Sequence, residues 1–96
     1  MKVKNIKQTC VACPSQWEGN LIDGRMFYAR YRWGALSIEL SKEPTNDVYK
    51  AMGKDGNLIY SEQLGGRYDG SMEQAELIKI MEGCGFIFNS SELTGI

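Results

Sequence analysis

The chain has 96 residues, of which 43% are hydrophobic and 24% are charged, and it carries a net charge of −1 at neutral pH. These proportions are those of an ordinary globular domain and exclude a largely disordered chain. No apolar run approaches the roughly 18 residues of a membrane span, and the basic first residues lack the apolar stretch of a signal peptide. We therefore expect a cytoplasmic protein that folds as a single domain over residues 1–96, with an ordered core over residues 10–88.

The charges are unevenly distributed along the chain. Residues 1–33 carry six basic and two acidic side chains, whereas residues 34–96 carry five basic and ten acidic ones. A distribution of this kind either steers a charged partner or holds the two parts of one domain together. We favour the second interpretation, because neither part forms a dense block of one sign.

The clearest secondary-structure pattern lies in residues 14–41 and predicts a three-stranded antiparallel meander. Its middle segment, residues 25–33, is rich in aromatic residues, which favour strands, and it follows Asp23-Gly24, a strong hairpin-turn dipeptide. After a second turn at Gly34-Ala35, apolar and polar residues alternate as they do in a half-buried strand. The outer strands of this meander are residues 17–21 and 36–41.

Residues 45–63 leave two interpretations open. In the first, strands at 48–52 and 58–63 flank Gly53-Lys54-Asp55-Gly56 as a second hairpin. In the second, Pro44-Thr45-Asn46-Asp47 opens a short helix that ends at Gly53 and precedes a strand. We favour the hairpin, because the aromatic and β-branched residues of this segment are typical of strands.

Residues 72–82 are the best candidate for a helix. Ser71 is a natural N-cap, Gln74 three positions later completes a capping box, and Gly83 supplies the C-terminal stop. The apolar stripe at helical spacing consists of Ala75, Leu77, Ile78, Ile80 and Met81. Residues 86–88 form either a short final strand or a hydrophobic plug. Together the elements predict an α+β fold, in which a curved antiparallel sheet of about five strands carries one C-terminal helix on one face.

Alternation along residues 25–33 divides their side chains between the two faces of the sheet. The inward set, which joins Trp17 in the core, is Phe27, Ala29, Tyr31 and Trp33, and the outward set is Met26, Tyr28, Arg30 and Arg32. Exposed arginine and tyrosine side chains anchor protein interfaces, stack on bases or hold phosphates. A purely structural role is the alternative, because glutamates on the neighbouring strands can pair with these arginines. The resulting candidate partner-binding set is Tyr28, Arg30, Arg32, Glu18 and Glu39.

The composition gives less support to two other classes of function. Nucleic-acid binding requires a basic surface for the phosphates, and only the first third of this chain is basic. Catalysis usually needs an acid–base side chain, and the chain contains no histidine and no recognisable nucleophile–base pair. We therefore expect no enzymatic activity and keep nucleic acid as the alternative partner.

Three cysteines, Cys10, Cys13 and Cys84, form the candidate metal set. Cys10 and Cys13 have the Cys-x-x-Cys spacing of two zinc ligands or of a redox pair. A structural zinc site needs four ligands, so a carboxylate or a partner would have to supply the fourth. We therefore expect reduced thiols and no cofactor, with zinc bound at these cysteines as the alternative.

The segment before the predicted helix is a candidate anion site. Gly66, Arg67 and Ser71 lie where the free backbone N–H groups of a helix start can bind an anion. The segment lacks the Lys-Ser/Thr ending of a Walker-type loop, so a structural role in the turn is the simpler interpretation.

Four motifs resemble those of small uncharacterised bacterial and phage-encoded proteins. They are Cys-x-x-Cys-Pro-Ser-Gln-Trp-Glu-Gly (10–19), Asp-Gly-Arg (23–25), Tyr-x-Arg-Tyr-Arg-Trp-Gly-x-Leu-Ser-Ile (28–38) and Gly-x-x-x-Asp-Gly-x-Met-x-x-x-Glu-Leu (65–77). The resemblance covers residues 10–83 and brings no established activity with it. It implies a small cytoplasmic protein carried on phages and other mobile elements, where proteins of this size often bind and block a host defence enzyme.

Two hypotheses about function follow. The first is a non-enzymatic protein-binding module, of which an inhibitor of a bacterial, CRISPR-like defence complex is one example. The second is a small nucleic-acid-binding or zinc-linked module that uses the basic N-terminal strands together with Cys10, Cys13 and Cys84.

Overall fold

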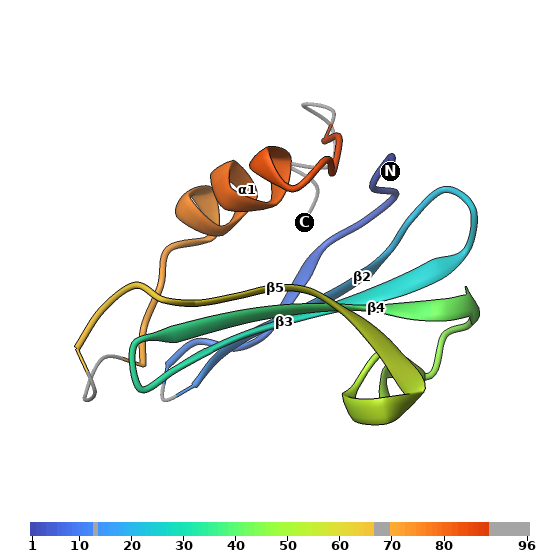
Figure 1. The fold of residues 1–96 in the computed structure, drawn as a ribbon. Coiled ribbons are helices and arrows are strands. Elements are labelled where there is room, and N and C mark those ends of the chain that lie inside the picture. Colours follow the sequence, from blue (N-terminus) through green and yellow to red (C-terminus); the bar gives the residue numbers. More distant parts are fainter. Residues whose placement is uncertain (13, 67–69, 89–96) are drawn as a thin grey trace.

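The computed structural model describes residues 1–12, 14–66 and 70–88, and it confirms the predicted α+β fold. Five antiparallel strands form one sheet in the order β1-β2-β3-β4-β5, and the helix α1 lies across one face of this sheet (Figure 1). The strands are β1 (Lys7–Cys10), β2 (Ser15–Asn20), β3 (Arg25–Arg32), β4 (Ala35–Pro44) and β5 (Gly56–Gln63). The helical elements are the 3₁₀ helices η1 (Val48–Lys50) and η2 (Gly53–Asp55) and the α-helix α1 (Gln74–Gly83). No helix in these described ranges is long and apolar enough to cross a membrane.

The predicted meander is formed by β2, β3 and β4. Trp17 of β2 lies opposite Ala29 of β3, which lies opposite Ile38 of β4. The turn between β2 and β3 is at Asp23-Gly24 as predicted, and a carboxylate oxygen of Asp23 accepts a hydrogen bond of 3.0 Å from the backbone N–H of Arg25. Hydrogen bonds from Arg25 hold the pKa of Asp23 below its ordinary value. The meander is extended by β1, a short polar edge strand that the sequence analysis did not single out.

The predicted second hairpin is wrong, because residues 48–52 form no strand. Asp47 caps η1 by accepting a hydrogen bond of 3.0 Å from the backbone N–H of Tyr49, which favours a helical turn at this point. The chain then forms η2 and enters β5, which pairs with β4. The alternative of a short helix followed by a strand is closer to the structure.

The helix begins two residues later than predicted. Its N-cap is Glu73, which makes no side-chain capping bond, so the predicted capping box between Ser71 and Gln74 is absent. Ser71 instead forms an isolated antiparallel bridge with Ala12, which keeps its backbone extended. Ala75 is exposed rather than part of the apolar stripe, and the helix includes Gly83, one residue beyond the predicted end at residue 82.

The core lies between the sheet and α1. Its fully buried side chains come from β2, β3, β4, α1 and the segment after the helix, and they include Trp17, Phe27, Leu36, Ile38, Leu77, Met81 and Phe86. The rings of Phe27 and Phe86 meet edge to face, with centroids 6.1 Å apart. The indole N–H of Trp17 donates to the Oε1 of Gln74 at 3.2 Å, which ties β2 to the start of α1. The segment 86–88 is therefore a hydrophobic plug rather than a strand of the sheet.

A buried serine connects the sheet to the segment before α1. Ser15 is fully buried at the start of β2, and its hydroxyl accepts a hydrogen bond of 3.1 Å from the backbone N–H of Met72. The same hydroxyl donates to the carbonyl of Val11, and the backbone N–H of Ser15 donates to the carbonyl of Gly70 at 2.9 Å. These bonds satisfy polar groups that have no access to water, so they fix the approach of the chain to the helix.

The first residues of the chain lie between the hairpin of β2 and β3 and the segment after α1. The backbone N–H of Val3 donates to the carbonyl of Ile87, and the N–H of Ile87 donates to the carbonyl of Met1, both at 2.8 Å. On the other side, the N–H of Ile22 donates to the carbonyl of Lys2 at 2.9 Å. Because the side chain of Val3 is only 1% exposed, this segment is part of the core.

Candidate functional site

The face of the sheet opposite α1 carries the candidate partner-binding residues, and the structure corrects their pairing. Glu18 and Glu39 both lie opposite Tyr28 in the cross-strand register, one on each side. Arg30 lies between uncharged residues of β2 and β4. Within the described residues, no carboxylate oxygen lies within 4.0 Å of the guanidinium of Arg30 or of Arg32. The structural alternative of cross-strand ion pairs is therefore not realised.

Tyr28 and Met26 were expected to face solvent, but each is only 6% exposed. The cause is the segment 48–55, which crosses this face on the side opposite α1 (Figure 1). Glu39 anchors that segment, since its carboxylate accepts a hydrogen bond of 2.8 Å from the backbone N–H of Gly53. Burial raises the pKa of Tyr28 above its ordinary value, the positive charge of Arg30 opposes this shift, and the nearby glutamates add to it.

The segment 48–55 divides the face into two parts. The covered part contains Met26 and Tyr28, whereas Arg30 is half-buried and Arg32 is exposed toward the turn between β3 and β4. Glu18 is also half-buried. Of the five candidate residues, Arg30 and Arg32 therefore remain accessible to a partner through their positively charged groups.

The turn between β3 and β4 presents an exposed tryptophan that the sequence analysis had assigned to the core. Trp33 is 61% exposed, and the guanidinium carbon of Arg32 lies 4.2 Å from the centre of its ring, a cation–π contact. The backbone of Trp33 is left-handed, with a φ of 54°, and Gly34 follows with a φ of 74°. Two successive left-handed residues make a two-residue hairpin turn of the primed type, which matches the twist of the strands.

The loop after β5 holds this turn in place. The side-chain amide of Gln63 donates to the carbonyl of Trp33 at 2.7 Å, and the backbone N–H of Leu64 donates to the carbonyl of Gly34 at 2.7 Å. Leu64 is itself 44% exposed. Arg32, Trp33 and Leu64 thus form an exposed surface at the end of the sheet, which we call the tip surface.

The structure does not bring the three cysteines together. Cys10 lies opposite Gln16 on the face away from α1, whereas Cys84 caps the end of α1 and packs against the core on the other side of the sheet. Cys13 lies outside the described residues. Burial raises the pKa of Cys84, which disfavours the thiolate that would bind a metal. No group of three or more Cys, Asp or Glu side chains in the described part of the chain is placed to hold a metal ion.

The candidate anion site is also not assembled by the residues that the structure describes. Gly66 lies beside the turn at Gly34, and Ser71 pairs with Ala12 instead of capping α1. Glu73 caps the helix without a side-chain bond, so the helix start carries an acidic group that would repel an anion. Arg67 lies outside the described residues.

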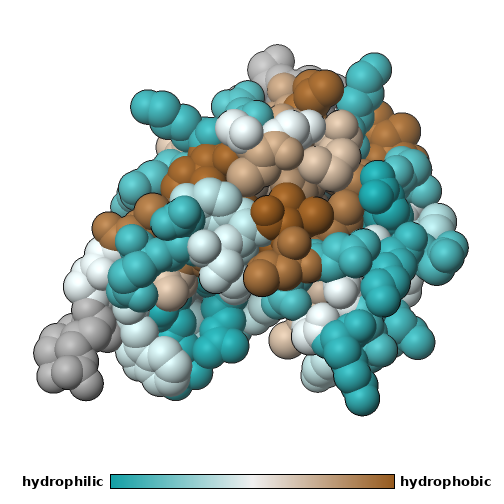
Figure 2. Space-filling model, viewed as in Figure 1, coloured by the Kyte–Doolittle hydropathy of each residue, from teal (hydrophilic) through white to brown (hydrophobic). Residues whose placement is uncertain are grey.

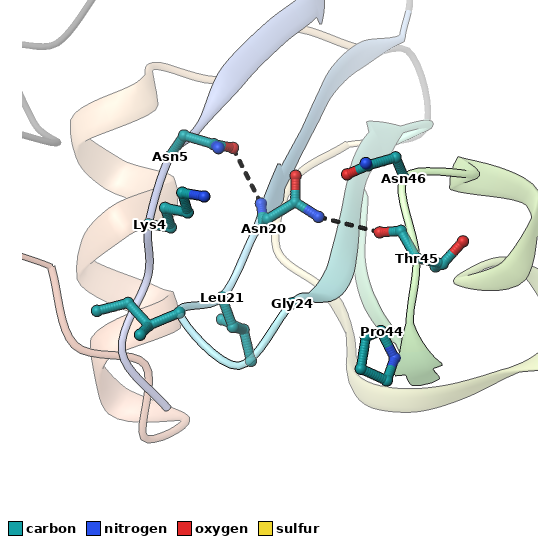
Figure 3. Close-up of a pocket in the computed structure, with 9 residues that line it drawn as sticks. Lys4, Asn5, Asn20, Leu21, Gly24, Pro44, Thr45 and Asn46 are labelled. Carbon is teal, nitrogen blue, oxygen red and sulfur yellow. Dashed lines mark hydrogen bonds between the residues drawn. The ribbon is translucent and has the colours of Figure 1, made fainter.

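A hollow of about 480 Å³ lies at the opposite end of the sheet from the tip surface, beside the turn between β2 and β3. Figure 3 shows it between Lys4 and Asn5 on one side and Pro44 to Asn46 on the other, with Asn20 at its centre. The backbone N–H of Asn20 donates to the side chain of Asn5, and its amide group donates to the carbonyl of Thr45, both at 3.0 Å. These amides hold the walls together, and among the described residues that line the hollow Lys4 alone is ionisable. The described lining mixes polar groups with the apolar side chains of Leu21, Ile22 and Pro44 and contains no nucleophile–base pair.

Comparisons of the chain with protein-family models, with curated proteins and with solved structures find no match.

Proposed function

We propose that the chain is a protein-binding module that contacts its partner through the tip surface and the neighbouring Arg30. The observation that carries this proposal is the geometry of Trp33, a large aromatic side chain that is exposed, stacked on an arginine and held in a left-handed backbone. A bulky residue in this conformation carries a strain of about 1–2 kcal/mol, which glycine at the same position of the turn would avoid. Tryptophan and arginine are also the residues most enriched among interface hot spots.

The charges of this surface indicate the chemistry of the partner. Arg30 and Arg32 have no carboxylate within 4.0 Å among the described residues, so their positive charges are available to acidic groups. Trp33 and Leu64 add apolar area beside them. The matching partner surface is an apolar pocket bordered by carboxylates. A bacterial defence complex that the module inhibits, the context implied by the sequence resemblance, is a special case of such a partner.

Affinity capture with matched variants tests the proposal. The bait proteins are the wild type, Trp33→Asn, Arg32→Gln and the control Tyr49→Ala, which removes another exposed aromatic side chain, from η1. We expect a bacterial protein that the wild type and the control retain and that the two tip variants lose. With the purified partner, truncation of a hot-spot residue should weaken the affinity by about 30-fold or more, the equivalent of about 2 kcal/mol.

Nucleic acid is the second candidate, because a tryptophan stacked on an arginine also forms a platform on which bases stack. Nuclease treatment of the lysate separates the two candidates. Capture that disappears with the nuclease, together with oligonucleotide binding that weakens steeply as salt rises, would replace the protein partner by nucleic acid. Equal retention of every partner by all four baits would show that the tip surface has no binding role.

A further inference from the structure

Among the residues that the structure describes, none pairs with the outer edge of the sheet at β5. β5 is the last strand in the sheet order, it is eight residues long, and the described strand with which it pairs is β4. In an antiparallel edge strand, every second residue directs its N–H and C=O groups away from the sheet. The edge at β5 is thus a row of hydrogen-bonding groups suited to another extended strand.

The side chains of β5 do not protect this edge. Its sequence, Gly-Asn-Leu-Ile-Tyr-Ser-Glu-Gln, contains no lysine and no proline, the residues that usually block an edge strand. Leu58 is 61% exposed, and Ile59 and Tyr60 are only partly buried. Figure 2, viewed as Figure 1, shows hydrophobic side chains gathered at the centre of the view, where β5 lies in front and α1 above it. The opposite edge strand, β1, is four residues long and begins with an exposed lysine.

The register with β4 assigns the side chains of β5 to the two faces of the sheet. Leu58 lies opposite Glu39, and Ser61 lies opposite Ser37, so both lie on the face away from α1. Tyr60 lies opposite the buried Ile38 and therefore faces the core. A bulge at Ile59 separates the two halves of the strand, with Asn57 and Glu62 on the helix side.

This arrangement of faces is compatible with pairing of β5 to itself. In an antiparallel pair, directly opposed residues lie on the same face of the sheet, and a shift by one residue places them on opposite faces. When Leu58 of one copy lies opposite Ser61 of the other, both residues lie on the face away from α1. The same register sets Asn57 opposite Glu62, and both of these lie on the helix side. A shift by one residue in either direction destroys this agreement.

The charges also permit self-pairing. Glu62 is the only charged side chain of β5, and in this register it lies opposite the amide of Asn57 in the other copy. The two Glu62 carboxylates are then five residues apart along the strand, roughly 17 Å at about 3.4 Å per residue. That distance exceeds the Debye length of about 8 Å at physiological ionic strength, so their mutual repulsion is largely screened.

We propose that two copies of the chain associate through antiparallel pairing of β5 with β5, with Leu58 of each copy opposite Ser61 of the other. The interface is isologous, so one strand supplies both halves of it. The two-fold axis runs perpendicular to the sheet, which becomes continuous and carries both α1 helices on the same face. On the helix side, Tyr60, Ile80 and Cys84 are partly buried and pack against the same core. The paired strand, Gly56–Gln63, contains no residue of the tip surface, since Arg32 and Trp33 lie at the turn between β3 and β4 and Leu64 follows β5.

Disulfide cross-linking between two variants, each with one added cysteine, tests the register. Leu58→Cys and Ser61→Cys are mixed, oxidised and analysed by non-reducing electrophoresis. The mixture should form a cross-linked dimer, because directly opposed residues lie within disulfide range. Neither variant alone should cross-link through its new cysteine, because two copies of residue 58 lie about three residues apart, beyond about 7 Å. The native cysteines are the same in all samples, so a cross-link that is equally strong in each would overturn the register.

Solution mass tests the association itself. Analytical ultracentrifugation of the wild type from micromolar to millimolar concentration should show twice the monomer mass of 10.8 kDa. Leu58→Lys/Ser61→Lys places like charges opposite each other and should remain monomeric, and mixing it with Leu58→Glu/Ser61→Glu should restore the dimer. The proposal is refuted if the wild type stays monomeric at every concentration, or if the Leu58→Lys/Ser61→Lys variant dimerises as well as the wild type does. A monomer whose β5 edge captures an extended foreign peptide refutes it as well.

Discussion

The left-handed backbone of Trp33 leads to a quantitative test of the tip surface. Replacing Trp33 by Asn keeps a residue that tolerates this conformation and creates Asn-Gly, the favoured dipeptide of a primed hairpin turn. Replacing it by Ala removes the same indole contacts, but alanine does not tolerate the conformation well. The two variants lose the same cation–π contact, worth about 0.5–1 kcal/mol, and the same partial burial, so the difference between them reports the backbone.

The expected difference follows from the cost of a left-handed backbone. That cost is about 1–2 kcal/mol for an ordinary L-residue and smaller for asparagine, whose side chain bonds locally. We therefore expect Trp33→Asn to be more stable than Trp33→Ala by about 1 kcal/mol. For a domain of about this size, 1 kcal/mol corresponds to a difference of about 4–8 °C in melting temperature. Trp33→Gly should behave as the asparagine variant does.

Chemical and thermal denaturation, followed by circular dichroism, measures these free energies of unfolding. Tyr49 provides the matched control, since it is an exposed aromatic residue in η1 that lacks a positive φ. At Tyr49 the alanine variant should be at least as stable as the asparagine variant, because helical turns favour alanine. If the order at position 33 matches the order at position 49, the turn is not left-handed and the strain argument fails.

Three further predictions test the fold around the tip surface and the covered face. Gly34→Ala should cost about 2–4 kcal/mol of stability in denaturation experiments, because φ is positive and a Cβ would meet the backbone carbonyls of the loop after β5. The control Gly53→Ala, which has open space around the new Cβ, should cost about 1 kcal/mol. Equal costs would contradict the packing at Gly34. Ser15→Ala should cost about 1–3 kcal/mol of stability by the same measurement, because it leaves buried backbone groups before α1 without their hydrogen-bond partner. A loss below about 0.5 kcal/mol would show that these backbone groups reach water. Because the pKa of Tyr28 is raised in the folded state, its contribution to stability is complete below pH 10 and is lost as the pH rises through the folded-state pKa. Tyr28→Phe should therefore reduce the loss in free energy of unfolding at alkaline pH, measured by denaturation at a series of pH values. An unchanged dependence of stability on pH would place the phenol in solvent.

The parts of the fold that could be predicted from sequence are those fixed by local pattern. The meander depends on alternation in β4 and on Asp23-Gly24, and both act within a few residues. The burial of Tyr28 could not be predicted in this way, because it depends on a segment that lies twenty or more residues further along the chain and is anchored by Glu39. The helix start was placed too early because the bridge between Ser71 and Ala12 overrides the local capping signal.

The candidate site was predicted in part. Arg32 is exposed as expected, but alternation was extended one residue too far, into a turn where the period of two no longer applies. Trp33 was therefore assigned to the core. The signal that identifies it is the glycine that follows, since a primed turn before β4 needs two left-handed residues and Gly34 can be only the second of them.

The position of the first residues has a consequence for how the chain folds during synthesis. The hairpins of the meander need only neighbouring segments, so they can form while later residues are still being made. Val3, however, bonds to Ile87, which is synthesised after every strand and after α1. Residues 1–3 thus leave the ribosome before every strand but are among the last to reach their final positions, and until then the core lacks the side chain of Val3.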